Sequence, residues 1–270
     1  MLPVELYGLI AEQVEVQPDL VSLLQASRTT LAEVERVLYR SIRLTKYRPA
    51  SFNQLLNVLL SNPRRASLVH HLRLHFAYGF GPEKDSVELL SSVLRRLVNL
   101  VRLELKSISL DLVDLASSCT FRLQRFGYYV DKITDPSLPI FLRSQPHLLH
   151  VSLPNYIGEM DVQQCSGNLQ RLTTLECSGH LANKLLPGRS VERLSLWNWD
   201  SLPIYAGCYP SLRALKLQMG LDSLNWAMFC PNLRFLALFI NPKDSARNFF
   251  PSVPGLLSDI TLIYNSSCER

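Results

Sequence analysis

Three histidines, His70, His71 and His75, lie close together in the sequence, and histidine is the side chain best suited to proton transfer near neutral pH. His71 and His75 alternate with leucines, the pattern of a strand with one buried face, so both imidazoles should share the other face with Arg73. General acid–base catalysis also needs a partner, and the local sequence supplies neither a carboxylate nor a nucleophile. We interpret these residues as a hydrated strand face. A hydrolase or transferase site at His71 and His75 is the catalytic alternative.

Other motifs that carry catalysis or bind metals are absent from the sequence. It contains no G-x-S-x-G, no glycine-rich phosphate loop and no H-E-x-x-H. Its six cysteines include no C-x-x-C pair and have no histidines at zinc-ligand spacing. Cys177, Cys208 and Cys230 fall at or near apolar positions of a repeating pattern, which favours small buried side chains over disulfides. We expect no enzymatic activity, no metal and no cofactor.

The formal net charge of +5 raises the question of a nucleic-acid partner. The densest basic stretch consists of Arg36, Arg40, Arg43, Lys46 and Arg48. With Tyr39 and Tyr47 interleaved, such a stretch can contact phosphates, and nucleic-acid binding is therefore kept as an alternative. Glu33 and Glu35 stand beside it, however, and basic side chains commonly solvate a helix end and interact with its dipole. We predict a hydrated helix end and no nucleic-acid partner.

The composition predicts an intracellular protein, cytoplasmic or nuclear. The hydrophobic share of 47% suits a continuous core, and no apolar run approaches the roughly eighteen residues needed to span a bilayer. Glu5 and Glu12 interrupt the N-terminal stretch where a secretory signal would need an apolar run. We expect neither a membrane partner nor secretion.

About the first forty residues read as three short amphipathic helices. The apolar residues at helical spacing are Leu6, Ile10 and Val14, then Leu20, Leu23 and Leu24, then Leu31, Val34, Val37 and Leu38. Asp19 is the predicted N-cap of the second helix, and Thr30 with Glu33 matches a capping box for the third. A segment this small buries too little surface to be stable by itself, so it must pack on something else.

The same segment resembles an F-box over residues 1–45. The resemblance is carried by Leu2-Pro3-Val4-Glu5 with Ile10, by Asp19-Leu20 and Leu23 leading into Ala26-Ser27-Arg28, and by Leu38-Tyr39-Arg40. F-box helices dock on a Skp-type adaptor, which links them to a cullin and a ubiquitin-charged conjugating enzyme. The resemblance implies adaptor contacts at Leu2, Pro3, Glu5, Ile10, Leu20 and Leu23.

An apolar triplet with the spacing L-x-x-L-x-L returns along the remaining chain. Its members are Val69-Leu72-Leu74, Leu100-Leu103-Leu105, Leu123-Phe126-Tyr128, Leu148-Val151-Leu153, Leu172-Leu175-Cys177, Val191-Leu194-Leu196, Leu212-Leu215-Leu217, Leu233-Leu236-Leu238 and Leu257-Ile260-Leu262. The last two members of each triplet have the period of a half-buried strand, and the interval of roughly twenty to thirty residues fits one strand and one return segment per repeat. This pattern predicts parallel strands stacked into one curved sheet.

Three copies of the pattern nearly coincide. YPSLRALKL (209–217) and CPNLRFLAL (230–238) agree in register, and QPHLLHVSL (145–153) repeats the scheme, with a proline that should end each return segment. The array resembles the irregular leucine-rich repeats of F-box proteins, and the order of the segments is similar to fungal members. A helix within Ser51–Ala66, capped by Ser51 and closed by Asn62-Pro63, should cover the open end of the first strand.

We therefore predict an α/β protein with a three-helix F-box at 1–45, a connector and capping helix at 46–66, and a curved leucine-rich-repeat solenoid with parallel strands at 67–270. Function should lie on the strand face that points away from the core. The later strands expose aromatic residues there, as interaction surfaces do. The predicted target-binding residues are Trp197, Lys216, Gln218, Phe235, Phe239 and Ile263.

These features favour a substrate-recognition subunit of a Skp-cullin-F-box ubiquitin ligase. Its head would bind the Skp-type adaptor and, through it, the cullin, and the concave face of its repeats would bind a target protein that the sequence does not identify. The alternative is a leucine-rich-repeat interaction scaffold that is not linked to ubiquitination.

Overall fold

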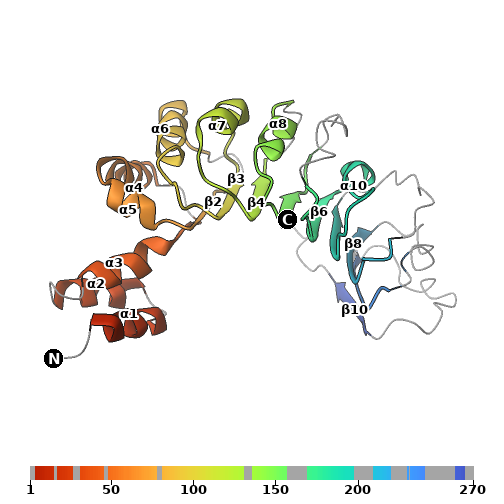
Figure 1. The fold of residues 1–270 in the computed structure, drawn as a ribbon, viewed down its shortest axis with the longest axis horizontal. Coiled ribbons are helices and arrows are strands. Elements are labelled where there is room, and N and C mark those ends of the chain that lie inside the picture. Colours follow the sequence, from red (N-terminus) through yellow and green to blue (C-terminus); the bar gives the residue numbers. More distant parts are fainter. Residues whose placement is uncertain are drawn as a thin grey trace. The chain divides into compact units, whose positions relative to one another are not determined.

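The computed structural model describes residues 4–14, 17–26, 31–45, 48–77, 81–130, 136–156, 169–197, 209–219, 230, 232–240 and 259–264. The chain forms two compact units, residues 1–123 and 124–270. Figure 1 draws the helices and strands of both.

The first unit begins with a head of three helices, α1 (Val4–Gln13), α2 (Gln17–Ala26) and α3 (Leu31–Arg40). Both α1 and α2 pack on α3. They enclose a small core of Ala11, Leu20 and Val34, against which pack Val14, Leu23, Val37 and Leu38. The three predicted helices are therefore present. The core they share is small, as expected for so short a segment.

Two details of the head differ from the prediction. α1 packs through Gly8 and Ala11, whereas Leu6 and Ile10 of the predicted buried stripe are exposed. Gly8 faces charged side chains of α3, since a Cβ there would lie 2.9 Å from Glu33 Oε2 and 3.2 Å from Arg36 Nη2. Asp19 lies in the first turn of α2, which begins earlier than predicted, and there it can still interact with the helix dipole.

The rest of the first unit is a parallel sheet with helical return segments. Its strands are β1 (Ser41–Leu44), β2 (His71–His75) and β3 (Arg102–Lys106). Its helices are α4 (Pro49–Ser61), α5 (Pro63–Leu68), α6 (Lys84–Leu94) and α7 (Leu112–Ser118). Neighbouring strands pair in parallel in chain order, with Ile42 beside Leu72 and Leu72 beside Leu103. The sheet thus begins at β1, within the range predicted for the head.

The predicted connector helix ends at Asn62-Pro63, as expected, but it begins at Pro49 instead of Ser51, and the short helix α5 follows it. Asn62 ends α4 and caps α5, because its side-chain oxygen accepts a hydrogen bond from the backbone N–H of Arg65 at 3.1 Å. α4 packs on α5 and on α6, the helix of the next repeat. It is therefore the return helix of a repeat rather than a separate end cap.

The second unit repeats the same arrangement. Its strands are β4 (Arg125–Tyr129), β5 (His150–Leu153), β6 (Thr174–Ser178), β7 (Arg193–Trp197), β8 (Ala214–Met219), β9 (Phe235–Ile240) and β10 (Asp259–Tyr264). Each strand pairs in parallel with the next. Two return helices of this unit are α8 (Leu138–Arg143) and α10 (Gly179–Leu185).

The L-x-x-L-x-L residues form the core of each unit, as predicted. Every member of the nine triplets whose side chain the structure describes is buried, and Leu172, Leu175 and Cys177 are fully enclosed. One buried strand face and one return segment per repeat, stacked in chain order, is the architecture of a leucine-rich-repeat solenoid.

The recurring Pro-x-Leu is a turn that leads into the strand. The N–H of Leu148 donates to the carbonyl of Gln145 at 3.3 Å, and that of Leu212 to Tyr209 at 3.2 Å. Proline thus occupies the second position of a four-residue turn, which suits its restricted φ. In the third copy, the N–H of Leu233 donates to the carbonyl of Cys230 at 3.1 Å.

Removal of the cap on α7 should lower stability measurably. Asp111 Oδ1 accepts hydrogen bonds from the N–H groups of Val113 and Asp114, both at 3.0 Å. Because Asp111→Ala removes this acceptor, we expect a loss of about 1 kcal/mol in the free energy of unfolding, measured by urea denaturation. Ser109→Ala, at an exposed position two residues earlier, should leave the midpoint unchanged. Equal midpoints for Asp111→Ala and the wild type would contradict the capping role.

Candidate protein-binding surfaces

A cluster of charges occupies the polar face of β2 and β3. Glu104 is 8% exposed, and its carboxylate contacts Arg73 Nε at 2.5 Å, Arg102 Nη2 at 2.6 Å and His75 Nε2 at 3.5 Å. Parallel register places Arg73 beside Glu104. The carboxylate comes from the next strand and not from the local sequence around His71, Arg73 and His75, and the face that was expected to be hydrated is partly buried. Alignment of successive repeats in register was the signal that could have found Glu104.

The cluster does not have the electrostatics of a general base. Burial opposes ionisation of Glu104, but hydrogen bonds from Arg73 and Arg102 outweigh it and lower the pKa of the carboxyl below its ordinary value. Burial also lowers the pKa of His75, against an opposing effect of Glu104. Protonation of Glu104 would weaken its ion pairs with both arginines, so we interpret this carboxylate as a group that orients Arg73 and Arg102.

Acid should destabilise the protein through this cluster. The pKa of His71 and that of His75 are lowered from 6.5, mainly by burial, so the unfolded chain binds protons at a higher pH than the folded one does. The free energy of unfolding should therefore fall as the pH drops below about 6.5, with a further loss below 4.5 as Glu104 protonates. Urea midpoints at a series of pH values measure this. In the double variant His71→Gln/His75→Gln, the urea midpoint should fall less steeply with pH at the higher pH values of the series. A fall as steep as that of the wild type would contradict the role of the two histidines.

Parallel register gathers most of the predicted target-binding positions into one row of the second unit. Gln218, Phe239 and Ile263 are register partners on β8, β9 and β10. Trp197 joins their row, since the preceding residue on β7 pairs with the residue before Gln218. The side chains of Gln218, Phe239 and Ile263 lie outside the described part of the structure. Four of the six predicted positions thus lie on adjacent strands at one level of the sheet.

The indole of Trp197 is held in place by polar neighbours. Its Nε1–H donates to Glu176 Oε1 at 2.9 Å, and Glu176 Oε2 accepts from Ser152 Oγ at 2.7 Å. Lys216 Nζ lies 5.7 Å from the centre of the indole ring, within the range of a cation–π interaction. Trp197 remains partly exposed. Glu176 and Ser152 were not predicted as part of this surface, although both lie in the same register row as Lys216.

Fewer of the described residues of β9 are exposed than predicted. Phe235, the remaining predicted target-binding residue, is 40% exposed. Ala237, two residues further along the same strand, is buried. The accessible part of this surface therefore centres on Trp197, Lys216 and Phe235.

The head exposes an apolar row on α1. Leu6, Leu9 and Ile10 have the i, i+3 and i+4 spacing of one helix face and are 39%, 58% and 44% exposed. Ile10 is thus accessible, and its contact with an adaptor stays a prediction. Leu2 and Pro3 lie outside the described residues, as does the side chain of Glu5 on α1.

Two predicted adaptor contacts hold the head together instead. Leu20 is 6% exposed in the core of the head, and Leu23 packs against that core. The helical spacing of Leu20 and Leu23 correctly predicts an apolar face on α2, but this face packs into the core of the head. Leu20 is therefore too deeply buried in this structure for the direct adaptor contact that was predicted.

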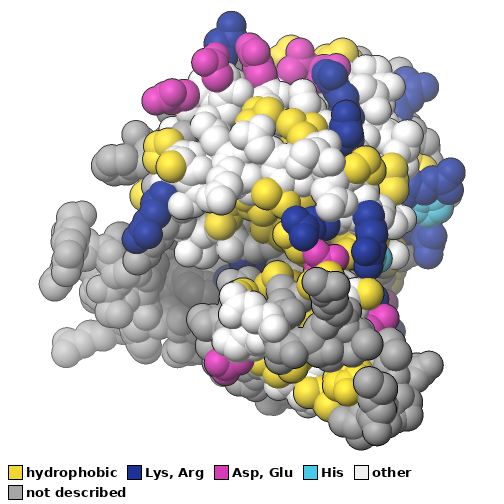
Figure 2. Space-filling view, turned by 90° about the vertical axis from the view of Figure 1, so that its left-hand side faces the viewer, with side chains coloured by type: hydrophobic (Ala, Val, Ile, Leu, Met, Phe, Trp, Pro, Cys, Tyr) yellow, Lys and Arg dark blue, Asp and Glu magenta, His cyan; other side chains and the backbone are white. Residues whose placement is uncertain are grey.

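Part of the basic stretch that suggested phosphate contacts is neutralised by acidic partners. Arg36 pairs with Glu33 at 3.0 Å and with Glu12 at 3.3 Å. Arg40 lies 3.7 Å from Glu12. Lys46 and Tyr47 lie outside the described residues. Figure 2 shows a group of acidic side chains along the upper edge of one molecular face, with basic side chains spread over the rest.

The described cysteines have the environments of structural residues. Cys177 and Cys230 are buried, as predicted for small apolar side chains. Burial raises the pKa of Cys177 and raises that of Cys119 to about 11, so neither thiol ionises readily near neutral pH. Within the described residues, no group of three or more histidine, cysteine or acidic side chains is arranged to hold a metal ion.

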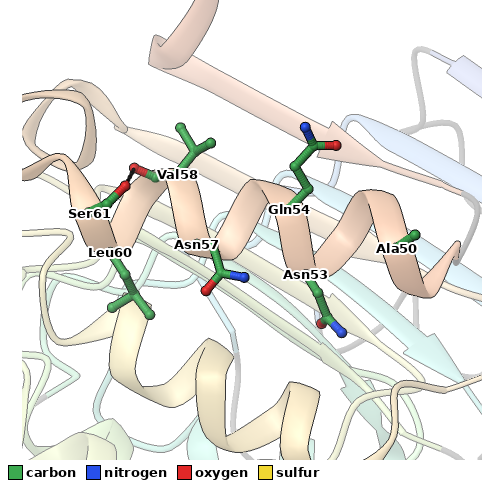
Figure 3. A pocket seen from close by; sticks show the side chains of 7 residues that line it. All are labelled: Ala50, Asn53, Gln54, Asn57, Val58, Leu60 and Ser61. Carbon is green, nitrogen blue, oxygen red and sulfur yellow. Dashed lines mark hydrogen bonds between the residues drawn. The ribbon is translucent and has the colours of Figure 1, made fainter.

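A shallow hollow of about 750 Å³ lies along α4. Figure 3 shows Asn53, Asn57 and Leu60 pointing to one side of this helix, with Gln54 and Val58 on another. Asn53 Oδ1 accepts a hydrogen bond from Ser86 Oγ at 2.8 Å, which ties α4 to α6. The hollow is open and has no charged group in its lining, so it lacks the features of a substrate pocket.

Known proteins provide only distant comparisons. No family model matches the chain, and no curated protein is similar to it. The solved structures that resemble it include a TLR13–ssRNA13 complex, with a TM-score of 0.49 and 16% identity over 76% of this chain and 30% of that chain. The internalin InlF from Listeria monocytogenes str. 4b F2365 has a TM-score of 0.45 and 14% identity over 71% of this chain and 56% of that chain.

A third structure is InlJ from Listeria monocytogenes, with a TM-score of 0.37 and 11% identity over 65% of this chain and 45% of that chain. The chain thus spans between 30% and 56% of the length of these three structures. Since all three TM-scores are below 0.5, the solenoid assignment rests on the parallel strands and buried triplets described above. Among the helices that the structure describes, none is long and apolar enough to cross a membrane.

Proposed function

We propose that this protein is the substrate-recognition subunit of a Skp-cullin-F-box ubiquitin ligase. The observation that carries the proposal is the exposed row of Leu6, Leu9 and Ile10 on α1, next to a head core formed by Ala11, Leu20 and Val34. An apolar helix face that the head does not bury is suited to a groove on another protein. The F-box resemblance of residues 1–45 implies that this other protein would be a Skp-type adaptor.

The second unit would bind the target protein. Trp197 supplies a large, partly exposed ring, and its hydrogen bond to Glu176 and its contact with Lys216 fix that ring before a partner arrives. Fixed aromatic side chains with polar neighbours are typical of interface anchors, because they lose little conformational freedom on binding. The protein would perform no chemistry itself. It would raise the effective concentration of the target near the conjugating enzyme.

Capture by a purified Skp-type adaptor tests the ligase assignment. The full chain should be retained by the immobilised adaptor under conditions in which a known F-box protein is retained. Failure of the wild-type chain to bind would reject this function and would favour the alternative, a leucine-rich-repeat scaffold whose head serves only to cover the first strands.

A further inference from the structure

The polar strand face of the first unit has a strong excess of positive charge. This face, called the cationic face below, consists of the side chains that alternate with the buried residues of β1, β2 and β3: Ser41, Arg43, His71, Arg73, His75, Arg102, Glu104 and Lys106. It has four cationic side chains and one carboxylate, a net charge of +3 with neutral histidines. None of these residues belongs to the head or to the surface around Trp197.

Register concentrates these charges. Arg43, Arg73 and Glu104 are partners in one row across the three strands, and His75 pairs with Lys106 in the next row along the same face. No ion pair joins the exposed Arg43 to a carboxylate of the described residues. Burial lowers the pKa of His71, and the positive charges of Arg102, Arg40 and Arg43 lower it further. The face therefore attracts anions.

Glu104 gives the cationic face a defined geometry. It accepts hydrogen bonds from Arg73 Nη2 at 3.0 Å and from Arg102 Nε at 2.6 Å. Two guanidinium groups bound to one carboxylate keep nitrogen donors that point elsewhere, since each guanidinium has five N–H groups. Their side chains are already ordered, so a second anion would bind them at a lower entropic cost.

The composition of the face favours carboxylates over a nucleic acid. Its described residues include no tyrosine, tryptophan or phenylalanine, the rings on which the bases of single strands stack. Arg102 and Lys106 lie four residues apart on β3, which is about 13 Å in a strand. An extended peptide has the same rise per residue, so acidic side chains four positions apart can reach both.

We propose that the cationic face binds an extended acidic segment of a partner protein, with its carboxylates at Arg43, Lys106 and the outer nitrogens of Arg73 and Arg102. This surface is separate from the α1 row and from the Trp197 surface, so its binding does not depend on the ligase assignment. It would let the first unit select partners by charge.

Fluorescence anisotropy with the full chain tests the proposal. The probe is a labelled twelve-residue peptide with glutamate at alternate positions, compared at low ionic strength with its glutamine counterpart and with a single-stranded RNA of equal length. We expect the wild type to bind the glutamate peptide and not the glutamine peptide. Arg43→Gln/Lys106→Gln should weaken this binding about tenfold, because two charge contacts are lost. Added salt should weaken it further.

The matched control is Lys84→Gln/Arg122→Gln, which removes the same charge at exposed positions of the first unit outside the cationic face. It should bind within about twofold of the wild type, since only long-range charge changes. Equal weakening in both double variants, equal binding of the two peptides, tighter binding of RNA, or no binding of the glutamate peptide would each overturn the proposal. If the double variant unfolds by circular dichroism, Arg43→Gln alone should still weaken binding severalfold, and wild-type affinity would refute the site.

Discussion

Ile10→Asp should abolish capture by the Skp-type adaptor while the protein stays folded. Ile10 is 44% exposed on α1, so a carboxylate at this position stays hydrated in the free protein and should change stability by no more than about 0.5 kcal/mol. In the complex, that charge would be buried without a partner, which costs several kcal/mol. Each 1.4 kcal/mol is about tenfold in affinity, so adaptor retention should fall below detection in a pull-down.

Ile140→Asp is the matched control. Ile140 lies on α8 of the second unit and is 48% exposed, so the same substitution is made at an equally exposed isoleucine away from the head. This variant should bind the adaptor as the wild type does. Full retention of Ile10→Asp would show that α1 is not the contact face, even if the chain binds the adaptor elsewhere. Loss of retention in both variants would indicate a general effect of added negative charge.

Trp197→Ala/Phe239→Ala should eliminate target capture and leave adaptor binding intact. Truncation of a central aromatic anchor typically costs 2 kcal/mol or more, and Trp197 shares its register row with Phe239. The measurement is quantitative affinity capture from cells with the proteasome blocked, in which target proteins should disappear from the variant sample while the adaptor remains. Unchanged capture of all partners would reject the Trp197 surface.

Two further variants separate binding from folding. Trp197→Phe keeps an aromatic ring but removes the N–H that donates to Glu176, so target capture should fall partway. Val113→Ala/Ile140→Ala truncates exposed residues of α7 and α8 and should change neither adaptor binding nor target capture. Simultaneous loss of the adaptor and of targets in Trp197→Ala/Phe239→Ala would mean that the chain has unfolded.

The solenoid could be predicted from local patterns because burial along one strand repeats every second residue. Leu72 and Leu74, like Leu103 and Leu105, are buried as the triplet spacing predicts. The start of the sheet was missed, since β1 is short and its sequence, SIRL, contains Arg43 of the basic stretch that was interpreted as a helix end. One apolar residue of that strand, Ile42, is buried beside Leu72.

The directions of the helix faces in the head were harder to predict. Leu6, Ile10 and Val14 have regular helical spacing, but α1 turns Gly8 and Ala11 toward α3 and leaves Leu6 and Ile10 exposed. An apolar stripe shows that a helix has a partner, and it does not show whether that partner is in the same chain. In the head, Ala11 of α1 and the partly buried Val14 just after this helix face the core.

The sequence by itself determined the repeat: the leucines that become the core, the prolines that end the return segments and the alternation that leaves every second residue on the polar face. These features depend on neighbours within a few residues, where backbone geometry sets the direction of each side chain. The tertiary structure alone decided which polar residues meet. Arg73 reaches Glu104 across 31 residues and Trp197 reaches Glu176 across 21, because both contacts depend on the register between strands.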